Sequence, residues 1–266
     1  MSGQPAAFIT GGSSGIGLEL AKQLANNGHP IALFARDAGR LQDVLRALKA
    51  DYPDVIVTAH PVDVSDRTAL NIATTAAMAT HGAPGWAIAN AGIAKPGEFL
   101  TQDLDSFEAQ MQTNYMGALY FAKALVPAMT AKGGRLVFIS SGAAFFGIYG
   151  YSAYAPPKFA MRALAEILRV ELKPHNISVT LAYPPDTDTP QLAYESQHKP
   201  AVTKAITAGG GLWSAQDVAR LIIRRATKGR FAATPGLQMR ALLTLHSLLA
   251  PALRFWQHGL VKKHLK

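Results

Sequence analysis

The stretch TGGSSGIG at residues 10–17 decides the fold. It lies between a short apolar run, residues 6–10, and a segment with helical spacing, residues 16–27. Glycines at such a junction let the chain turn sharply, let backbone N–H groups approach a pyrophosphate and let helix and strand pack closely. The N-terminus of the following helix then faces the phosphates with its partial positive charge. The stretch therefore predicts a nucleotide site, and a plain tight turn is the alternative.

Short apolar runs and helical patterns alternate beyond this turn. The further apolar runs lie at residues 30–35, 55–60, 86–90, 135–140, 177–182 and 230–234, and the helical patterns at residues 38–51, 67–80, 103–111, 113–131 and 153–173. Runs this short indicate strands that are buried on both faces, joined by right-handed crossovers into a parallel sheet. We therefore predict an α/β fold, a Rossmann-type doubly wound parallel sheet of about seven strands. It forms a single domain, residues 1–234, with a C-terminal helical extension at residues 235–266.

Composition limits the other function classes. Of the 266 residues, 49% are hydrophobic and 16% are charged, which is typical of a chain with a large buried core. The chain has no cysteine, so disulfides, thiol nucleophiles and thiolate metal sites are excluded. The eight histidines are scattered without ligand-like spacing, and we expect no metal. The formal net charge of +9 favours anionic ligands, but no interleaving of aromatic and basic residues supports nucleic-acid binding.

The end of the second apolar run indicates which dinucleotide is bound. An acidic residue at this place accepts hydrogen bonds from a ribose 2′-hydroxyl, whereas an arginine accommodates a 2′-phosphate. Arg36 therefore favours NADP(H), although the neighbouring Asp37 is an acidic residue of the kind that favours NAD. Arg40 follows one helical turn later and is either a second phosphate contact or a solvated helix residue. After the third run, Asp63 precedes Val64 and can accept from an adenine amino group or cap the next helix.

A second group of residues indicates acid–base chemistry. Tyr154 and Lys158 are four residues apart, which places both side chains on one face of a helix. A nearby ammonium lowers the pKa of a phenol, so the pair is typical of proton transfer to a carbonyl oxygen. Ser141 ends the fifth apolar run, at the edge of the sheet where ligands bind, and can donate to the same oxygen. Asn114 lies near a predicted helix start and is either a further site residue or an ordinary cap.

The motifs together cover residues 6–234. They are TGxxxGIG at residues 10–17, Asp63-Val64, Asn90-Ala91-Gly92, Asn114, Ser141, Tyr154-x-x-x-Lys158 and a proline turn at Pro184. Jointly they resemble the short-chain dehydrogenase/reductase family, which implies an enzyme with a catalytic tetrad. In that tetrad Tyr154 would donate the proton, Ser141 would orient the carbonyl, Lys158 would lower the tyrosine pKa and hold the nicotinamide ribose, and Asn114 would hold a water in a proton relay.

The same resemblance implies the cofactor contacts, with Asn90-Ala91-Gly92 lining the cofactor channel. We assign the NADP(H) site to Gly11, Ser13, Ser14, Gly15, Ile16, Gly17, Arg36, Arg40, Asp63, Val64, Asn90, Ala91, Gly92, Tyr154, Lys158, Pro184, Thr187 and Thr189. Two prolines, Pro156 and Pro157, separate the tyrosine from the lysine where the family usually has small or polar residues. Because proline is tolerated in the first turn of a helix, we predict that this helix begins at about Tyr154.

The octapeptide YPPDTDTP at residues 183–190 resembles that of one subfamily, the 3-ketodihydrosphingosine reductases. The resemblance implies NADPH-dependent reduction of 3-ketodihydrosphingosine to dihydrosphingosine in sphingolipid synthesis. A reductase for another hydrophobic ketone, such as a steroid or a 3-ketoacyl substrate, and a non-catalytic NADPH-binding sensor are the alternatives. Phe145, Phe146, Tyr149 and Tyr151 are candidate walls of the substrate pocket. The family commonly forms dimers or tetramers, so we expect a homo-oligomer.

Two segments leave their roles open. Residues 184–211 lack a strong period and are predicted to form a mobile lid rather than a plain connector. Residues 235–266 alternate apolar and basic side chains, as in a helix that lies on an anionic bilayer, or one that caps the core or a dimer surface. Residues 1–5 do not resemble a signal peptide, and no stretch reaches the ~20 apolar residues of a spanning helix. We therefore predict a cytoplasmic protein, with association at the cytoplasmic face of a membrane left open.

Overall fold

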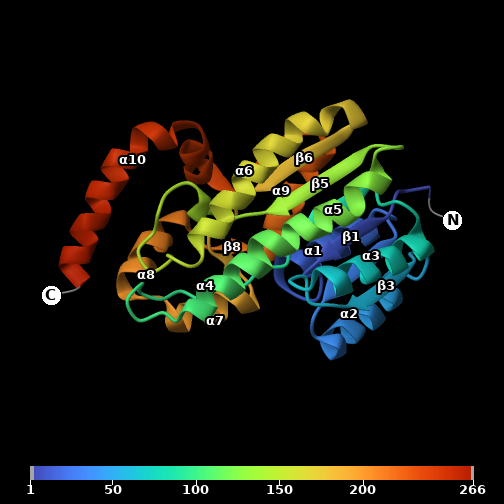
Figure 1. Cartoon of the computed structure of the whole chain (residues 1–266), viewed down its shortest axis with the longest axis horizontal. Helices are drawn as coiled ribbons and strands as arrows, with labels where there is room; N and C mark the ends of the chain where they lie inside the picture. The colour runs from blue at the N-terminus through green and yellow to red at the C-terminus, as the bar shows by residue number, and fades with distance from the viewer. Residues whose placement is uncertain (1–2, 265–266) are drawn as a thin grey trace.

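A parallel sheet of seven strands runs through the middle of the molecule (Figure 1). The computed structural model describes residues 3–264; Met1, Ser2, Leu265 and Lys266, the last of which belongs to the predicted basic extension, lie outside the described residues. The strand order is β3-β2-β1-β4-β5-β6-β9. The strands are β1 (Ala7–Thr10), β2 (Ile31–Ala35), β3 (Val57–Pro61), β4 (Trp86–Ala89), β5 (Gly134–Ile139), β6 (Ile177–Ala182) and β9 (Ala232–Ala233). The predicted fold class is therefore confirmed.

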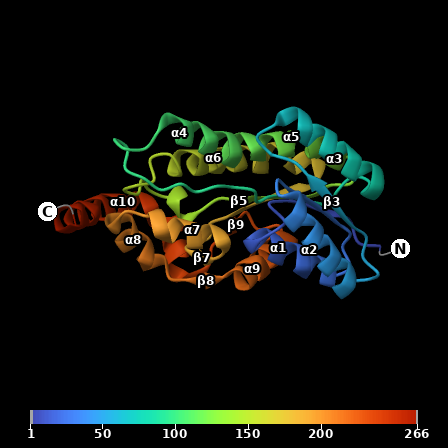
Figure 2. The same ribbon diagram turned by 90° about the horizontal axis from the view of Figure 1, so that it is seen from below.

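Helices cover both faces of this sheet, which lies between two helical layers in Figure 2. One layer contains α3 (Arg67–His81), α4 (Leu104–Met111), α5 (Gly117–Met129) and α6 (Ala155–Glu171). The other contains α1 (Gly15–Asn26), α2 (Ala38–Asp51) and α9 (Ala215–Thr227). The chain changes direction across the sheet between β1 and β4, which are neighbours. In open α/β sheets the crevice at such a reversal, beyond the carboxyl ends of the strands, is where ligands bind.

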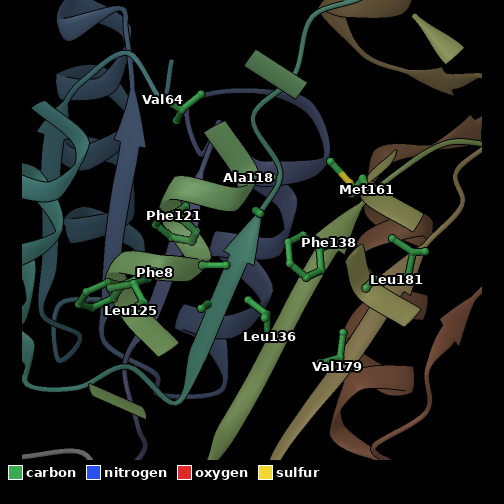
Figure 3. Packing of buried hydrophobic residues seen from close by; sticks show 14 of the residues in the cluster. Phe8, Val64, Ala118, Phe121, Leu125, Leu136, Phe138, Met161, Val179 and Leu181 are labelled. Carbon is green, nitrogen blue, oxygen red and sulfur yellow. The ribbon is translucent and has the colours of Figure 1, made fainter. Parts of the chain in front are cut away.

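The central strands are largely apolar because their alternate residues enter two separate cores. Phe8 of β1 and Leu136 and Phe138 of β5 face the core beneath α5 and α6, where they pack with Phe121 and Leu181 (Figure 3). The intervening residues, such as Ile9 and Val137, enter a second core on the opposite face. Burying one such side chain contributes about 2 kcal/mol. A helix on the protein surface has one polar face, whereas a strand between two helical layers is apolar on both faces. The apolar runs therefore fit strands.

One helical region differs from the prediction of two separate helices at residues 103–111 and 113–131. A π-helical turn, η1 (Gln112–Met116), joins α4 directly to α5. A π-turn accommodates one extra residue without ending the helix, so the chain continues through it. The seventh strand is also shorter than the predicted residues 230–234, since only Ala232 and Ala233 pair with β6.

Residues 184–211, predicted as an aperiodic lid, are largely folded. They contain β7 (Thr187–Asp188), α7 (Pro190–His198) and α8 (Ala201–Thr207), and β7 pairs with β8 (Trp213–Ser214). The hydroxyl of Thr189 caps α7 by accepting from the Leu192 N–H at 3.2 Å, and Pro190 occupies the first helical position. This is the usual place for proline in a helix. Both helices are too short to show a clear hydrophobic period, and the start of α7 is set by this cap.

The C-terminal extension forms α10 (Gly236–His264), as predicted for a helical extension. Its end projects away from the sheet in Figure 1, and Figure 2 shows it beside α7 and α8 at one end of the molecule. Gln257 attaches this helix to the loop after β5, because its amide donates to the Gly147 carbonyl at 2.8 Å. Within residues 3–264, no helix combines the length and apolar character needed to cross a membrane.

Candidate active site

The glycine-rich turn between β1 and α1 has the shape that a bound pyrophosphate requires. Gly11 and Gly15 have φ angles of +64° and +53°, which side chains other than glycine rarely adopt. A Cβ atom at Gly17 would overlap the carbonyl oxygen of Gly11, so α1 approaches the turn more closely than any side chain allows. Ser14 precedes α1 and makes no side-chain cap bond, which leaves the first N–H groups of the helix to an anion. The turn therefore fits a dinucleotide.

The end of β4 holds this turn in place. The backbone N–H groups of Asn90 and Ala91 both donate to the Thr10 hydroxyl at 3.0 Å. The Asn90 side-chain amide donates to the carbonyls of Thr10, at 3.0 Å, and Gly11, at 3.2 Å. Asn90 thus links the two strands on either side of the crevice, and its amide is already engaged with the backbone.

At the ends of β2 and β3 lie the residues predicted to hold the adenosine part. The exposed guanidinium of Arg36 lies 3.8 Å from the Asp63 carboxylate. Asp37 caps α2 by accepting from the Arg40 N–H at 2.9 Å, so its carboxylate is engaged by the helix. Val64 is buried against α5. The geometry leaves Arg36 as the positive group at the tip of β2, where a 2′-phosphate would be bound.

A cleft of about 240 Å³ opens beyond the carboxyl ends of β1, β4, β5 and β6. Of the predicted site residues, those that line it are Gly11, Ser14, Gly15, Ile16, Asn90, Ala91, Gly92, Ser141, Tyr154, Lys158, Pro184, Thr187 and Thr189. Thr189 reaches the glycine-rich turn, since its methyl group is 2.9 Å from where a Cβ at Gly15 would be. Arg36, Arg40, Asp63 and Val64 lie beyond this lining, at the strand ends.

Tyr154 and Lys158 lie together at the start of α6. Tyr154 is the residue before the helix, and the first turn contains the two prolines. The prediction that the helix begins at about Tyr154 is therefore confirmed. The Lys158 ammonium lies 5.6 Å from the centre of the Tyr154 ring and donates to the Ile139 carbonyl at 3.0 Å. Both residues are buried.

The pKa values of this pair are shifted by burial. Burial lowers the pKa of Lys158 to about 8, although the charge on Glu195 opposes this shift. Burial and the charge on Glu195 raise the pKa of Tyr154, and a hydrogen bond with the Ser141 hydroxyl lowers it. The Lys158 ammonium donates to the Ile139 carbonyl of β5, and its expected lowering of the tyrosine pKa stays a prediction.

Asn114 is fully buried in the π-turn and is not a helix cap. Its side chain forms two hydrogen bonds with the backbone of Ile93, accepting from the N–H at 2.8 Å and donating to the carbonyl at 2.9 Å. A Cβ at Gly92 would lie 3.0 Å from the Asn114 oxygen and 3.5 Å from the Lys158 nitrogen, so the three residues meet. Asn114 therefore fixes the strand end that faces Lys158.

Comparison with known proteins agrees with this arrangement. Residues 5–200 match the family model described as short chain dehydrogenase.

The chain belongs to the short-chain dehydrogenase family.

Its relatives include a 3-dehydrosphinganine reductase of Danio rerio, 38% identical over 86% of this chain and 70% of the relative. A 3-ketodihydrosphingosine reductase of Bos taurus is 37% identical over 91% of this chain and 74% of the relative. Among solved structures, a short-chain dehydrogenase from Sphingobium yanoikuyae in complex with NADPH is similar, with a TM-score of 0.77 and 26% identity. That comparison covers 97% of this chain and 95% of the solved one.

Four polar residues of this short-chain dehydrogenase were missed at the sequence level. Glu195 on α7 is buried in the cleft and accepts from the Tyr151 hydroxyl at 2.9 Å. The buried Lys199 ammonium lies 3.6 Å from Glu195 and donates to both carboxylate oxygens of Asp186, at 2.9 and 3.0 Å. Gln191 donates to the other Glu195 oxygen at 3.0 Å. The signal was the spacing of four residues from 191 to 195 to 199, which places Gln191 and Glu195 on one face of α7 and Lys199 at its C-terminal end.

The predicted substrate walls are only partly in the cleft. Phe146 and Tyr151 line it, and the Tyr151 ring lies 5.0 Å from that of Tyr154. Phe145 does not line it: this ring is buried in the core and stacks on Tyr183 at 4.4 Å. Both phenylalanines follow the short 3₁₀ turn after Ser141, and only Phe146 faces the cleft.

An apolar groove of about 810 Å³ continues from the cleft of this short-chain dehydrogenase. Ile148 and Tyr151 line both spaces, so they mark where the two meet. The remaining walls of the groove include Phe99, Leu100, Tyr149, Ala155, Pro156, Phe159 and, from α10, Arg254, Gln257, His258 and Val261. Tyr149, predicted as a pocket wall, belongs to this groove rather than to the cleft.

Proposed function

We propose that this short-chain dehydrogenase uses NADPH to reduce 3-ketodihydrosphingosine to dihydrosphingosine. The proposal is carried by Tyr154, Ser141 and Lys158, which line one cleft together with the glycine-rich turn. Its support for this substrate is the identity of 37–38% to reductases named for it, over most of both chains. The groove beside the cleft offers an apolar path for a long alkyl chain.

The residues of the cleft would act on the carbonyl oxygen. When bound, the dinucleotide supplies the hydride that reduces the carbonyl carbon. The Ser141 hydroxyl donates a hydrogen bond to the carbonyl oxygen, and Tyr154 gives its phenolic proton to the same oxygen, so that the ketone becomes an alcohol. Lys158 stabilises the phenolate that remains. Glycines 11, 15 and 17, with the N-terminus of α1, would hold the pyrophosphate.

The reaction is expected to depend on pH through Lys158, whose pKa is about 8. Below this pH the side chain carries the charge that stabilises the phenolate; above it the charge is lost. We therefore expect kcat for ketone reduction to fall about tenfold per pH unit above about pH 8. The measurement is the rate of NADPH oxidation at saturating substrate across this range. A rate that stays constant up to about pH 9.5 would contradict the assignment of Lys158.

The expected fall in kcat above about pH 8 does not arise from a loss of folding stability at Lys158. Its pKa is about 8 in the folded protein and returns towards 10.5 on unfolding. Between these values the unfolded chain binds more protons than the folded one, so the contribution of Lys158 to stability increases as pH rises. Thermal denaturation at each pH separates a change in folding stability from a change in kcat.

Arg36 is proposed to select NADPH over NADH. Arg36→Ala is expected to raise KM for NADPH about 30-fold and to leave KM for NADH within about twofold, because only NADPH carries the 2′-phosphate. Steady-state kinetics with both coenzymes measures this. Arg46→Ala is the matched control, since Arg46 is an exposed arginine of α2 that pairs with Asp43. An unchanged NADPH preference in Arg36→Ala would show that another residue reads the phosphate.

A substrate panel tests the proposed function. NADPH oxidation is measured with 3-ketodihydrosphingosine, a steroid ketone, a 3-ketoacyl substrate and a short-chain 2-amino ketone. We expect the largest kcat/KM for the sphingoid ketone and a lower value for the short chain, which leaves the apolar groove empty. Equal turnover across the panel would support a general reductase of hydrophobic ketones. NADPH binding without turnover of any ketone would support a sensor.

We also propose that α10 rests on an anionic membrane surface, where a lipid ketone resides. Leu237, Leu248 and Phe255 of this helix are 84%, 78% and 83% exposed, and basic residues follow towards its end. Such a combination suits a helix in the plane of a bilayer. A dimer or tetramer, which would compete for the same surface, stays a prediction that light scattering can check.

Replacing Leu248 and Phe255 together by serine is expected to lower binding to phosphatidylserine-containing vesicles by about tenfold or more, because exposed apolar area would no longer be buried in the bilayer. Cosedimentation with the vesicles measures the bound fraction. The control replaces Ile56 and Ile72 by serine, two residues 54% and 65% exposed that lie outside α10. Equal binding of both double variants and the unmodified protein would remove the membrane proposal.

A further inference from the structure

Glu195 has an unusual position for a carboxylate. It is only 6% exposed, yet it lines the same cleft as Tyr154 and Ser141. One of its oxygens accepts from the Tyr151 hydroxyl, whose ring is 5.0 Å from the Tyr154 ring. A carboxylate removed from water needs a partner of opposite charge. The surroundings of Glu195 therefore show which cation this part of the cleft is built to hold.

Lys199 alone does not neutralise its neighbours. Its ammonium donates to both oxygens of Asp186, at 2.9 and 3.0 Å, and lies farther from Glu195, at 3.6 Å. One cation thus serves two carboxylates, and the cluster of Asp186, Glu195 and Lys199 carries a net charge of −1. Within residues 3–264, no carboxylate lies at salt-bridge distance from Lys158, the other buried cation of the cleft. Lys158 is instead bonded to the backbone of β5.

This excess negative charge also acts on the catalytic phenol. The charge on Glu195 raises the pKa of both Tyr151 and Tyr154. Proton donation by Tyr154 leaves a phenolate, which a neighbouring carboxylate destabilises. A substrate that brings its own positive charge between Glu195 and Tyr154 would offset this effect during the reaction. The side of the cleft at Glu195 therefore matches a positively charged group of a substrate better than a neutral one.

Resting on the proposed reductase function, we propose that Glu195 binds the ammonium group that 3-ketodihydrosphingosine carries beside its ketone, and so selects 2-amino ketones. With the carbonyl oxygen at Tyr154 and Ser141, the neighbouring carbon presents its amine towards Tyr151 and Glu195. The charge-assisted hydrogen bond then completes the neutralisation of the cluster. The alkyl chain leaves past Ile148 into the apolar groove. Steroids and 3-ketoacyl compounds lack this ammonium.

The test compares 3-ketodihydrosphingosine with an analogue of equal chain length that has hydrogen in place of the amine. In the unmodified enzyme we expect kcat/KM for the amine to exceed that for the analogue by about 100-fold. Glu195→Gln is expected to lower the first value by about 100-fold and the second by less than about threefold. A purely structural role for Glu195 would lower both values equally, and that result would overturn the proposal, as would no change in either.

Two further variants make the result specific. Glu166→Gln removes the same charge from an exposed residue of α6 that pairs with Arg162, and the amine preference is expected to stay unchanged. Glu195→Asp keeps the charge, and with it the partner of Lys199, but withdraws the carboxylate by one methylene. It should lower the amine preference by about tenfold, and it provides the test if Glu195→Gln does not fold. If folded Glu195→Asp keeps the full preference for the amine substrate, Glu195 does not contact the ammonium directly.

Binding separates this inference from the proposed function. The product dihydrosphingosine carries the same ammonium, and calorimetry gives its Kd without turnover. We expect Glu195→Gln to weaken its binding by about 100-fold. If the unmodified enzyme reduces neither ketone but shows this difference, the proposed function fails and the ammonium site stands. If it reduces the sphingoid ketone but both proteins bind dihydrosphingosine equally, the ammonium site fails and the function stands.

Discussion

Replacing Tyr154 by phenylalanine is expected to lower kcat for ketone reduction by about 10³-fold. The change removes one oxygen atom and with it the phenolic proton that lies next to Ser141. The ring stays, so its contact with Tyr151 and the start of α6 are retained. Because the hydroxyl is not needed to hold the pyrophosphate, the Kd for NADPH should change by less than about twofold.

The measurement combines single-turnover rates with thermal denaturation and NADPH fluorescence titration. Tyr120→Phe is the matched control: Tyr120 lies on α5, packs against the core and lies outside the cleft lining. Its rate is expected to stay within about twofold. If Tyr154→Phe keeps more than about a tenth of the rate, a different group supplies the proton and the proposed mechanism is wrong.

The second large effect is expected at Gly17. In Gly17→Ala the new methyl group would overlap the Gly11 carbonyl oxygen and the side-chain nitrogen of Asn90, two atoms that the crevice cannot easily move. The backbone of Gly11 is tied to β2, since its N–H donates to the Phe34 carbonyl at 2.7 Å. We expect unfolding free energy to fall by about 3 kcal/mol, and NADPH to bind about 100-fold more weakly because α1 moves away from the turn.

Calorimetric Tm and fluorescence titration with NADPH would measure the two effects. A loss of this size lowers Tm by roughly 6–10 °C. Gly39→Ala provides the control, because the new Cβ in α2 would meet only the Asp37 carboxylate, at 3.5 Å, which is ordinary contact. There alanine should be neutral or stabilise by about 0.5 kcal/mol. Equal Tm values for both variants would show that the close approach at Gly17 is not required.

The central sheet was predictable because its strands are apolar on both faces. Residues 31–35 contain no polar side chain, residues 177–182 contain only Ser178 and Thr180, and a proline or an asparagine precedes each run. The helix at residues 38–51 was predicted with its observed bounds, since Asp37 supplies a clear cap. Strands and helices of this kind can be predicted from local sequence alone. Bounds set by pairing, as in the two-residue β9, depend on where the neighbouring strand ends.

Parts of the site were less predictable, for a different reason. The tyrosine, lysine and glycine motifs have fixed spacing, and the structure brings those that line the cleft together. Glu195 and Asp186 lie nine residues apart, and only the packing of α7 joins them through Lys199. Phe145 was assigned to the pocket from its place after Ser141, but the direction of a side chain in a 3₁₀ turn was not visible in the sequence.

The short helix α7 has a consequence for how the two ligands communicate. Thr189 at its start rests against Gly15 of the glycine-rich turn, and Glu195, six residues on, accepts from Tyr151, whose ring lies beside that of Tyr154. At 1.5 Å per residue these two points are separated by roughly 9 Å along one stiff rod. A shift of this helix at its coenzyme end would also move Glu195, so binding of coenzyme and of the lipid ketone would be coupled through less than two helical turns.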